Sequence, residues 1–226
     1  MAHRRQGYRF ENDWPLEELK KSNYETRKNP GFTLPVNLKI EGGQRVLSFD
    51  KAKDILHAAK KISVIDCPCR TKRRNCDAPV NTCFDLNNMA EFVLGNKELK
   101  DRHPREVTLN EALDILEMTH EAGLVHMAYV NGDEGPVNSM CSCCSCCCHV
   151  LSAVLRFGLA PHYLSSQTTT VTDSSMCTGC GVCADRCQFG AREMVDGSLT
   201  FKPELCFGCG LCVSKCPTGA IKIVYK

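Results

Sequence analysis

The first strongly periodic segment of the chain begins at Asp50. Apolar residues fall on one face of a helical wheel from there to Lys61, and Asp50 is placed to cap the first turn, so the pattern predicts a helix over residues 50–61. A short apolar run over residues 62–65 follows at once and predicts a buried strand. This strand leads directly into Cys67-Pro68-Cys69-Arg70.

The same order of helix and strand recurs further along the chain. Thr108 and Glu111 have the spacing of a capping box, which predicts a helix over residues 109–122 that ends at Gly123. An apolar run over residues 124–130 predicts the second strand. Apolar spacing between proline and glycine boundaries predicts three further helices, at residues 15–21, 86–94 and 149–157.

Two strands separated by helices favour a small parallel strand pair with a right-handed crossover. The expected fold class is α+β: an N-terminal α/β domain that is rich in cysteine, followed by a small C-terminal domain. Because parallel strands end at the same edge of a sheet, the loops that follow them should meet there. These loops carry two groups of cysteines: Cys67, Cys69, Cys76 and Cys83 in the first, and Cys141, Cys143, Cys144, Cys146, Cys147 and Cys148 in the second. We expect a metal site shared by both groups, and the competing arrangement is a local site made by the first group alone.

Composition and charge indicate the expected partners and cellular location of the protein. The chain has 226 residues, 18 cysteines and a formal net charge of +2, so no charge excess indicates nucleic acid or an anionic membrane as a partner. The first fifteen residues lack the apolar core of a signal peptide, and no apolar run is long enough to span a membrane. We therefore expect a cytoplasmic protein with reduced, metal-binding cysteines, in an anaerobic host or sensitive to oxygen.

Eight cysteines near the C-terminus follow one spacing twice. The pattern C-x2-C-x2-C-x3-C recurs at an offset of 29 residues, and the second copy ends in Cys216-Pro217. This region, residues 172–226, resembles the bacterial-type ferredoxin domain that carries two [4Fe-4S] clusters. The resemblance implies that the last cysteine of each run ligates the other cluster. The implied ligand sets are Cys177, Cys180, Cys183 and Cys216 for cluster one, and Cys206, Cys209, Cys212 and Cys187 for cluster two. Gln188 stands where the family has proline, which is not a ligand.

The ten N-terminal cysteines leave several alternatives open. They can hold two clusters with two cysteines to spare, one cubane and one less usual centre, or zinc or copper as in metallothionein. The pattern CPCR…C…C followed by CxCCxCCC resembles a cysteine-rich region found in anaerobic ferredoxin-domain proteins. We favour one or two further iron–sulfur clusters here, because a ferredoxin domain needs a destination for its electrons.

Other residues are weighed against simpler roles. His149 adjoins the cysteine run and is a candidate ligand, although a structural role at a helix start is favoured; His126 is expected to be a buried histidine with its hydrogen bonds satisfied. Residues 1–45 are expected to form an arm whose aromatic side chains, Trp14, Tyr24 and Phe32, pack on its own domain, with packing on a partner subunit as the alternative. The expected domains are the arm at 1–45, a cysteine-rich α/β domain at 46–165 and the ferredoxin domain at 172–226, and residues 165–172 are expected to be a polar linker.

Three functions fit this pattern. The favoured one is an electron-transfer protein, a ferredoxin-type subunit that passes single electrons to a redox partner or a larger oxidoreductase complex. The second is a reductase whose N-terminal cluster is the catalytic site. The third is a thiolate protein that stores thiophilic metal ions. No nucleotide-binding or flavin motif is present, which favours an electron-transfer component over an autonomous enzyme.

Overall fold

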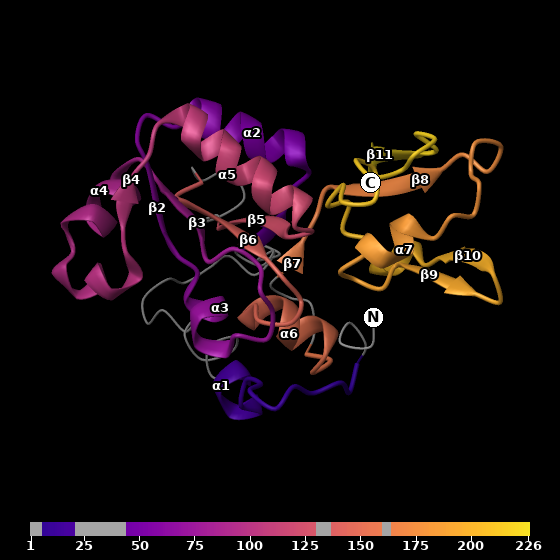
Figure 1. Cartoon of the computed structure of the whole chain (residues 1–226), viewed down its shortest axis with the longest axis horizontal. Helices are drawn as coiled ribbons and strands as arrows, with labels where there is room; N and C mark the ends of the chain where they lie inside the picture. The colour runs from indigo at the N-terminus through magenta and orange to yellow at the C-terminus, as the bar shows by residue number, and fades with distance from the viewer. Residues whose placement is uncertain (1–5, 21–43, 130–136, 160–163) are drawn as a thin grey trace, which may run out of the picture.

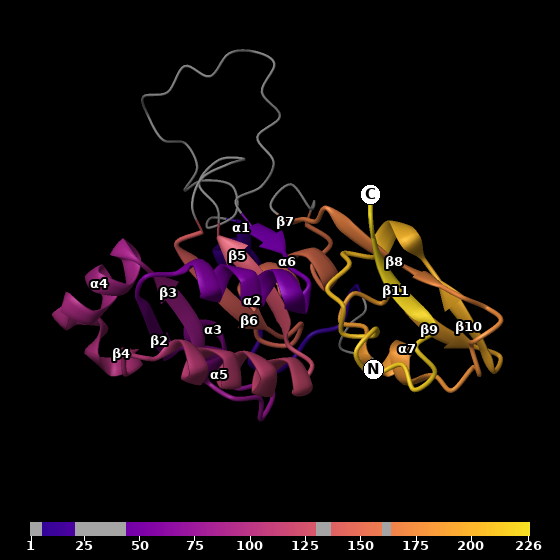
Figure 2. The ribbon, with the colours of Figure 1, turned by 90° about the horizontal axis from the view of Figure 1, so that it is seen from above.

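The computed structural model describes residues 6–20, 44–129, 137–159 and 164–226 (Figure 1). A seven-stranded sheet lies between α2 and α5 on one side and α1, α3 and α6 on the other (Figure 1). A smaller C-terminal unit with two two-stranded sheets lies beside it. The two units remain side by side in the perpendicular view (Figure 2).

The N-terminal unit alternates short strands with helices. Its helices are α1 (Leu16–Lys20), α2 (Phe49–Ala58), α3 (Pro68–Arg73), α4 (Asn88–Gly95), the 3-10 helix η3 (Lys97–Arg102), α5 (Leu109–Glu121) and α6 (His149–Leu155). Its strands are β1 (Gln44–Val46), β2 (Ile62–Asp66), β3 (Asn81–Leu86), β4 (Arg105–Glu106), β5 (Val125–Tyr129), β6 (Ser139–Cys143) and β7 (Leu164–Ser165). The C-terminal unit contains β8 (Thr168–Thr172), α7 (Val182–Arg186), β9 (Arg192–Val195), β10 (Ser198–Phe201), the 3-10 helix η4 (Pro203–Leu205) and β11 (Ile221–Tyr225).

The expected parallel strand pair is wrong. The sheet order is β4-β2-β3-β6-β5-β1-β7, and β2, β3, β6 and β5 pair antiparallel in turn. The two predicted strands, β2 and β5, are thus separated by β3 and β6 and run in opposite directions. The cysteine groups nevertheless meet, because β6 runs in the same direction as β2 and ends at the same edge of the sheet. The inserted strands contain Cys83, Cys141 and Cys143, which the sequence pattern had placed in loops.

One face of the sheet packs on α2 and α5. Leu56 of α2 and Leu116 of α5 are fully buried against Val64, Phe84 and Met140 of the sheet. Half of the predicted capping box of α5 is confirmed, since the Thr108 side chain accepts a hydrogen bond from the Glu111 backbone N–H at 3.2 Å, whereas the Glu111 carboxylate pairs with Arg105. Helix α2 begins earlier than predicted: Ser48, not Asp50, is its N-cap, because the Ser48 hydroxyl accepts from the Lys51 N–H.

The opposite face of the sheet carries cysteines. Side chains alternate along a strand, so the burial of Met140 against α2 and α5 sends Cys141 and Cys143 to the other side, toward α6. Val150 and Leu151 of α6 pack there with Cys143. Strand alternation therefore creates a layer of thiols between the sheet and α6.

The C-terminal unit corrects a second prediction. Residues 165–172 were expected to be a linker, but residues 168–172 form β8, which pairs antiparallel with β11. The run Thr-Thr-Thr-Val-Thr is rich in β-branched residues, which favour extended backbone.

Polar contacts hold the two units together at the end of α5. The His120 ring Nε2 lies 2.8 Å from the Ser214 hydroxyl, and Arg186 donates to the backbone carbonyls of His120 at 2.7 Å and Glu121 at 2.8 Å. Lys215 adds an ion pair with the Glu121 carboxylate.

The N-terminal residues that the structure describes pack on the same unit, as expected for the arm. Trp14 is buried, and its indole Nε1 donates to the Cys147 carbonyl at 2.9 Å. The two other aromatic residues expected in this role, Tyr24 and Phe32, lie outside the described residues. Over the described part of the chain, no helix has both the length and the apolar character needed to cross a membrane.

Candidate metal centres

Two sets of four cysteines line cavities in the C-terminal unit. Cys177, Cys180, Cys183 and Cys216 line one cavity. Cys187, Cys206, Cys209 and Cys212 line a second one. These are the two crossed sets that the sequence resemblance implies. We call them the first and second ferredoxin quartets.

Gly208 shows why the loops between these cysteines need glycine. Its φ is +56°, and a Cβ added there would lie 2.4–2.6 Å from the hydroxyl and backbone of Thr168. No L side chain fits at that position without moving β8. The glycine lets the loop of the second ferredoxin quartet lie directly against this strand.

Arg192 supplies a buried positive charge between the two quartets. It contacts the Cys183 thiol. Burial raises the pKa of the Cys212 thiol to about 11, and the positive charge of Arg192 opposes this increase. Its guanidinium donates to the hydroxyls of Thr172 at 2.8 Å and Thr170 at 2.9 Å. Its Nε is buried and has no hydrogen-bond partner among the described residues, so one donor remains available near the thiols. A cluster with negatively charged sulfurs fits this environment.

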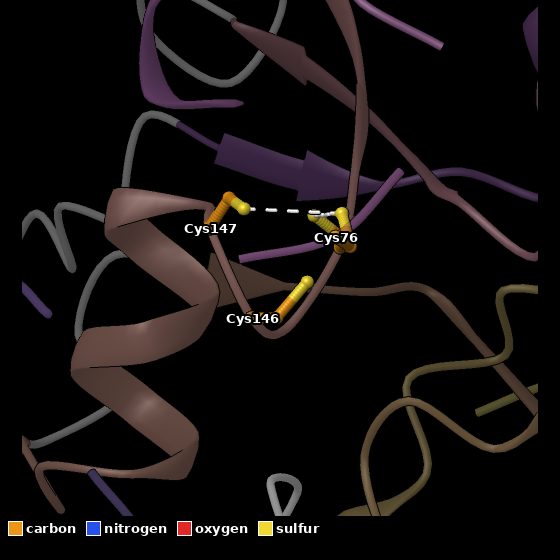
Figure 3. Close-up of side chains that lie close together, drawn as sticks. Cys76, Cys146 and Cys147 are labelled. Carbon is orange, nitrogen blue, oxygen red and sulfur yellow. Dashed lines mark hydrogen bonds between the residues drawn. The ribbon is translucent and has the colours of Figure 1, made fainter. Parts of the chain in front are cut away.

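A third set of cysteines joins the two N-terminal groups. The sulfur atoms of Cys76, Cys144, Cys146 and Cys147 all lie within 4.8 Å of one another, and we call this set the N-terminal quartet. Cys76 follows α3, and the other three come from the turn between β6 and α6. Figure 3 shows Cys76, Cys146 and Cys147 pointing toward one another from these separate segments. The shared site predicted from the sequence is therefore present geometrically, and Cys76 belongs to it.

The other six N-terminal cysteines form a closed ring. Each thiol shifts the pKa of two neighbouring thiols, in the order Cys67, Cys69, Cys148, Cys143, Cys141 and Cys83, and back to Cys67. Cys67, Cys69, Cys83 and Cys141 pack in one buried cluster, and Cys141, Cys143 and Cys148 pack in a second. We call this set the hexad. The hexad also combines both sequence groups. Cys67 and Cys69 come from the start of α3, and Cys83 comes from β3. The other three members come from β6 and the start of α6.

The pKa shifts alternate around the hexad. Interactions with both neighbours lower the pKa of the Cys67, Cys141 and Cys148 thiols. The same interactions raise the pKa of the thiols between them, which are Cys69, Cys83 and Cys143. Such a concentration of sulfur ligands, away from any disulfide, suits thiophilic metals.

Arg70 lies between the hexad and the N-terminal quartet. Its side chain is 2% exposed, and its Nη2 lies 2.9 Å from the Ser142 carbonyl and 3.8 Å from the Cys144 sulfur. Nearby negative thiolates, Cys144 foremost, raise the pKa of Arg70 against the opposing effect of burial. Arg70 and Arg73 of α3 are both buried, and Arg70 lies beside the thiolates, whereas Arg74 at the C-cap of α3 is exposed.

Buried hydrogen bonds hold the turn that carries the second cysteine group in place. Arg156 is fully buried and donates from Nε to the Ser145 carbonyl at 3.2 Å, and it pairs with Asp13 of the N-terminal segment. The Ser145 hydroxyl donates to Gln188 Oε1 at 2.7 Å, and Gln188 Nε2 donates to the Gly123 carbonyl at 2.9 Å. The spacing of the cysteines gave no signal for Arg156 or Asp13. Gln188 was visible only as a departure from the family's proline.

The two histidines singled out in the sequence lie outside the cysteine sets. The His149 ring stacks edge-on against Trp14, with 4.9 Å between ring centroids. His126 is buried, and its Nδ1 lies 3.1 Å from the Ser142 hydroxyl, while its Nε2 has no partner among the described residues. Burial lowers the pKa of His126 to about 3, so it is neutral at physiological pH. The prediction that the hydrogen bonds of His126 are satisfied is therefore confirmed for Nδ1 and wrong for Nε2.

Comparison with known families agrees with the C-terminal geometry. The family model described as "4Fe-4S binding domain" matches residues 170–193 and 199–222, which include all eight cysteines of the two ferredoxin quartets. A comparison with curated proteins found no significant match. The fold and these matches define the chain as an iron–sulfur electron-transfer protein whose C-terminal region carries [4Fe-4S] clusters.

Proposed function

We propose that this chain is a ferredoxin-type subunit of an anaerobic redox system, in which single electrons pass between the two C-terminal clusters and a third iron–sulfur centre held by the hexad. The observation that carries the proposal is the continuity of buried side chains between the three cysteine sets. In this proposal the arm is residues 1–45, the hexad domain is 46–165, the ferredoxin domain is 172–226, and the partner is another redox protein.

The first link joins the two ferredoxin quartets. Cys183 of the first quartet and Cys212 of the second are buried in one cluster with Ile221. The packed side chains exclude water from the space between the two sets. Exclusion of solvent and the buried charge of Arg192 are among the features that set the potential of an iron–sulfur cluster.

The second link joins the C-terminal unit to the hexad. Cys187 and Cys209 of the second ferredoxin quartet pack in the same apolar cluster as Cys143 and Cys148 of the hexad. Phe189 and Phe207, whose ring centroids are 4.7 Å apart, belong to this cluster as well. The order of the three sets is therefore first quartet, second quartet, hexad, with the second quartet in the middle.

Burial favours an electron relay at the hexad. Cys67, Cys83, Cys143 and Cys148 are buried, and Cys69 and Cys141 are half-buried. An iron–sulfur centre here would accept and release electrons with most of its ligands shielded from bulk solvent. Eighteen cysteine thiols also make the chain vulnerable to oxidation, which supports an anaerobic setting.

One observation favours the reductase as a second candidate. The hexad offers six sulfur ligands, whereas a cubane cluster takes four. A centre of unusual composition at this position is a candidate for binding a small substrate. Addition of small thiols or disulfides to the reduced protein, followed by spectroscopy of the N-terminal centre, separates this candidate from the relay.

Iron and acid-labile sulfide per chain test the proposal on protein purified without oxygen. The expected result is more than about eight of each in the full chain, since two [4Fe-4S] clusters account for eight. Cys143→Ser, in the hexad, should remove the excess and keep the eight. Cys209→Ser, in the second ferredoxin quartet, should instead remove about four of each. Eight irons and eight sulfides in the unaltered chain, unchanged by Cys143→Ser, would refute an iron–sulfur centre in the hexad.

A further inference from the structure

The sulfur atoms of the N-terminal quartet are in direct contact. The Cys76 sulfur lies 3.7 Å from that of Cys144 and 3.8 Å from that of Cys147, and all four sulfurs fall within 4.8 Å of one another. A single metal ion with four sulfur ligands at about 2.3 Å places those sulfurs at the corners of a tetrahedron. The edges of this tetrahedron are about 3.8 Å long, which is the ligand distance multiplied by 1.63. The two sulfur–sulfur distances at Cys76 match this edge length.

The ferredoxin quartets of the same chain provide the comparison. Among the described residues, the N-terminal quartet is the one set of ligands whose atoms all lie within 4.8 Å. The sulfurs of each ferredoxin quartet instead line a cavity and do not all lie within that distance of one another. A cubane must fit between its four cysteine sulfurs, so it holds them well apart. The N-terminal quartet has the spacing of a mononuclear site, not of a cluster.

We propose that Cys76, Cys144, Cys146 and Cys147 bind a single thiophilic cation in tetrahedral geometry, of the zinc(II) or iron(II) class. A divalent ion with four thiolates has a net charge of −2, which needs compensation in a buried site. Arg70, beside Cys144, supplies one positive charge. The Asn75 backbone N–H donates to the Cys147 sulfur at 3.3 Å, and such outer contacts orient the ligands of metal sites.

The site connects two segments that the sheet alone leaves separate. Cys76 lies in the loop after α3, whereas the other three ligands lie in the turn between β6 and α6. Cys143 and Cys148, which stand at the two ends of this turn, belong to the hexad. The unusual run of three successive cysteines is thus divided: Cys146 and Cys147 face the single ion, and Cys148 faces the hexad. The ion acts as a structural link that holds the hexad ligands in place.

Metal content and X-ray absorption test this inference on the full chain purified without oxygen. We expect either one zinc per chain or one iron in excess of sulfide, and the two results identify the ion. If the ion is zinc, its absorption edge should report about four sulfurs at about 2.3 Å with no metal neighbour. If the ion is iron, Mössbauer spectroscopy should show one mononuclear site with four sulfur ligands beside the cluster signals. This outcome is independent of whether the hexad holds iron.

Two variants with buried cysteines from the same run make the assignment specific. Cys146→Ser should lose this single ion, whereas Cys143→Ser, which belongs to the hexad, should retain it. Loss of about four irons together with four sulfides in Cys146→Ser would overturn the inference, because it would place a cluster in the quartet. A short metal–metal distance at a bound zinc ion, or the absence of a mononuclear iron signal when no zinc is present, would overturn it even if the variants fail to fold. Absence of both zinc and excess iron from the unaltered protein would do the same.

Discussion

The hydroxyl of Ser145 donates a hydrogen bond to the side-chain oxygen of Gln188 at 2.7 Å. Ser145 stands between two ligands of the N-terminal quartet, and Gln188 directly follows Cys187 of the second ferredoxin quartet. A residue that replaces the proline of the ferredoxin pattern therefore connects the two units of the protein. Gln188 is 7% exposed, so this contact is shielded from water.

Replacement of Gln188 by alanine should loosen this connection. The Ser145 hydroxyl and backbone N–H would both lose their acceptor in a buried position, which costs about 1–3 kcal/mol. Hydrogen exchange should then increase around residue 145 while the C-terminal clusters remain bound. Gln167→Ala, at an exposed glutamine, is the matched control and should leave exchange unchanged. Equal exchange in both variants would show that Gln188 does not hold the units together.

The buried charge of Arg70 should be essential for the N-terminal centres. Arg70→Met removes the cation beside Cys144 and leaves the carbonyls of Pro79 and Ser142 without their donor. Breaking a buried charged pair typically costs about 3–5 kcal/mol, so the N-terminal unit should bind less metal and unfold at lower temperature. Arg74→Met, at an exposed position directly after α3, should behave like the unaltered protein. Normal metal content in Arg70→Met would contradict the role assigned to this charge.

Arg192 should raise the potentials of the C-terminal clusters. Reduction adds negative charge, so removal of a nearby buried cation in Arg192→Met should make reduction less favourable. At an effective dielectric constant of about 20, a close unit charge is worth a few kcal/mol, or a negative shift on the order of 100 mV. An anaerobic redox titration followed by electron paramagnetic resonance measures this shift. Lys222→Met, at an exposed position of β11, controls for net charge and should shift the potentials far less. Equal shifts in both variants would mean that long-range charge alone is responsible.

The crossed ligand sets make opposite predictions for two similar substitutions. Cys187→Ser should remove the cluster bound with Cys206, although Cys187 lies in the sequence run of Cys183. Cys216→Ser should remove the cluster bound with Cys177. Spectroscopy that separates the two clusters decides the matter. If each substitution destroyed the cluster of its own sequence run, the crossed assignment would be wrong.

The sequence predicts some parts of this structure well, because their determinants are local. The cap of α5 depends on Thr108 and Glu111, three residues apart. The spacing of the C-terminal cysteines specifies the two ferredoxin quartets that the structure brings together. In both cases a short stretch of chain contains the whole pattern.

Other parts depend on contacts that no short stretch contains. The segment of β6, Ser-Met-Cys-Ser-Cys, was interpreted as the start of a metal-binding loop, because its cysteines hid the alternation of a strand. Without β3 and β6 the direction of β5 relative to β2 was assigned incorrectly. The division of the second cysteine group depends on where β6 ends. Cys141 and Cys143 lie on the face of β6 opposite Met140, which packs on α2 and α5, and the turn after the strand carries the three cysteines of the quartet.

The number of electrons that the chain accepts tests the account most directly. Coulometric reduction of the fully loaded protein without oxygen should take up more than two electrons per chain, one for each ferredoxin cluster and at least one for the hexad centre. Cys143→Ser should lower the uptake to two and leave the C-terminal signals in place. An uptake of two electrons by the unaltered chain, with the same value in Cys143→Ser, would contradict an electron-carrying centre in the hexad.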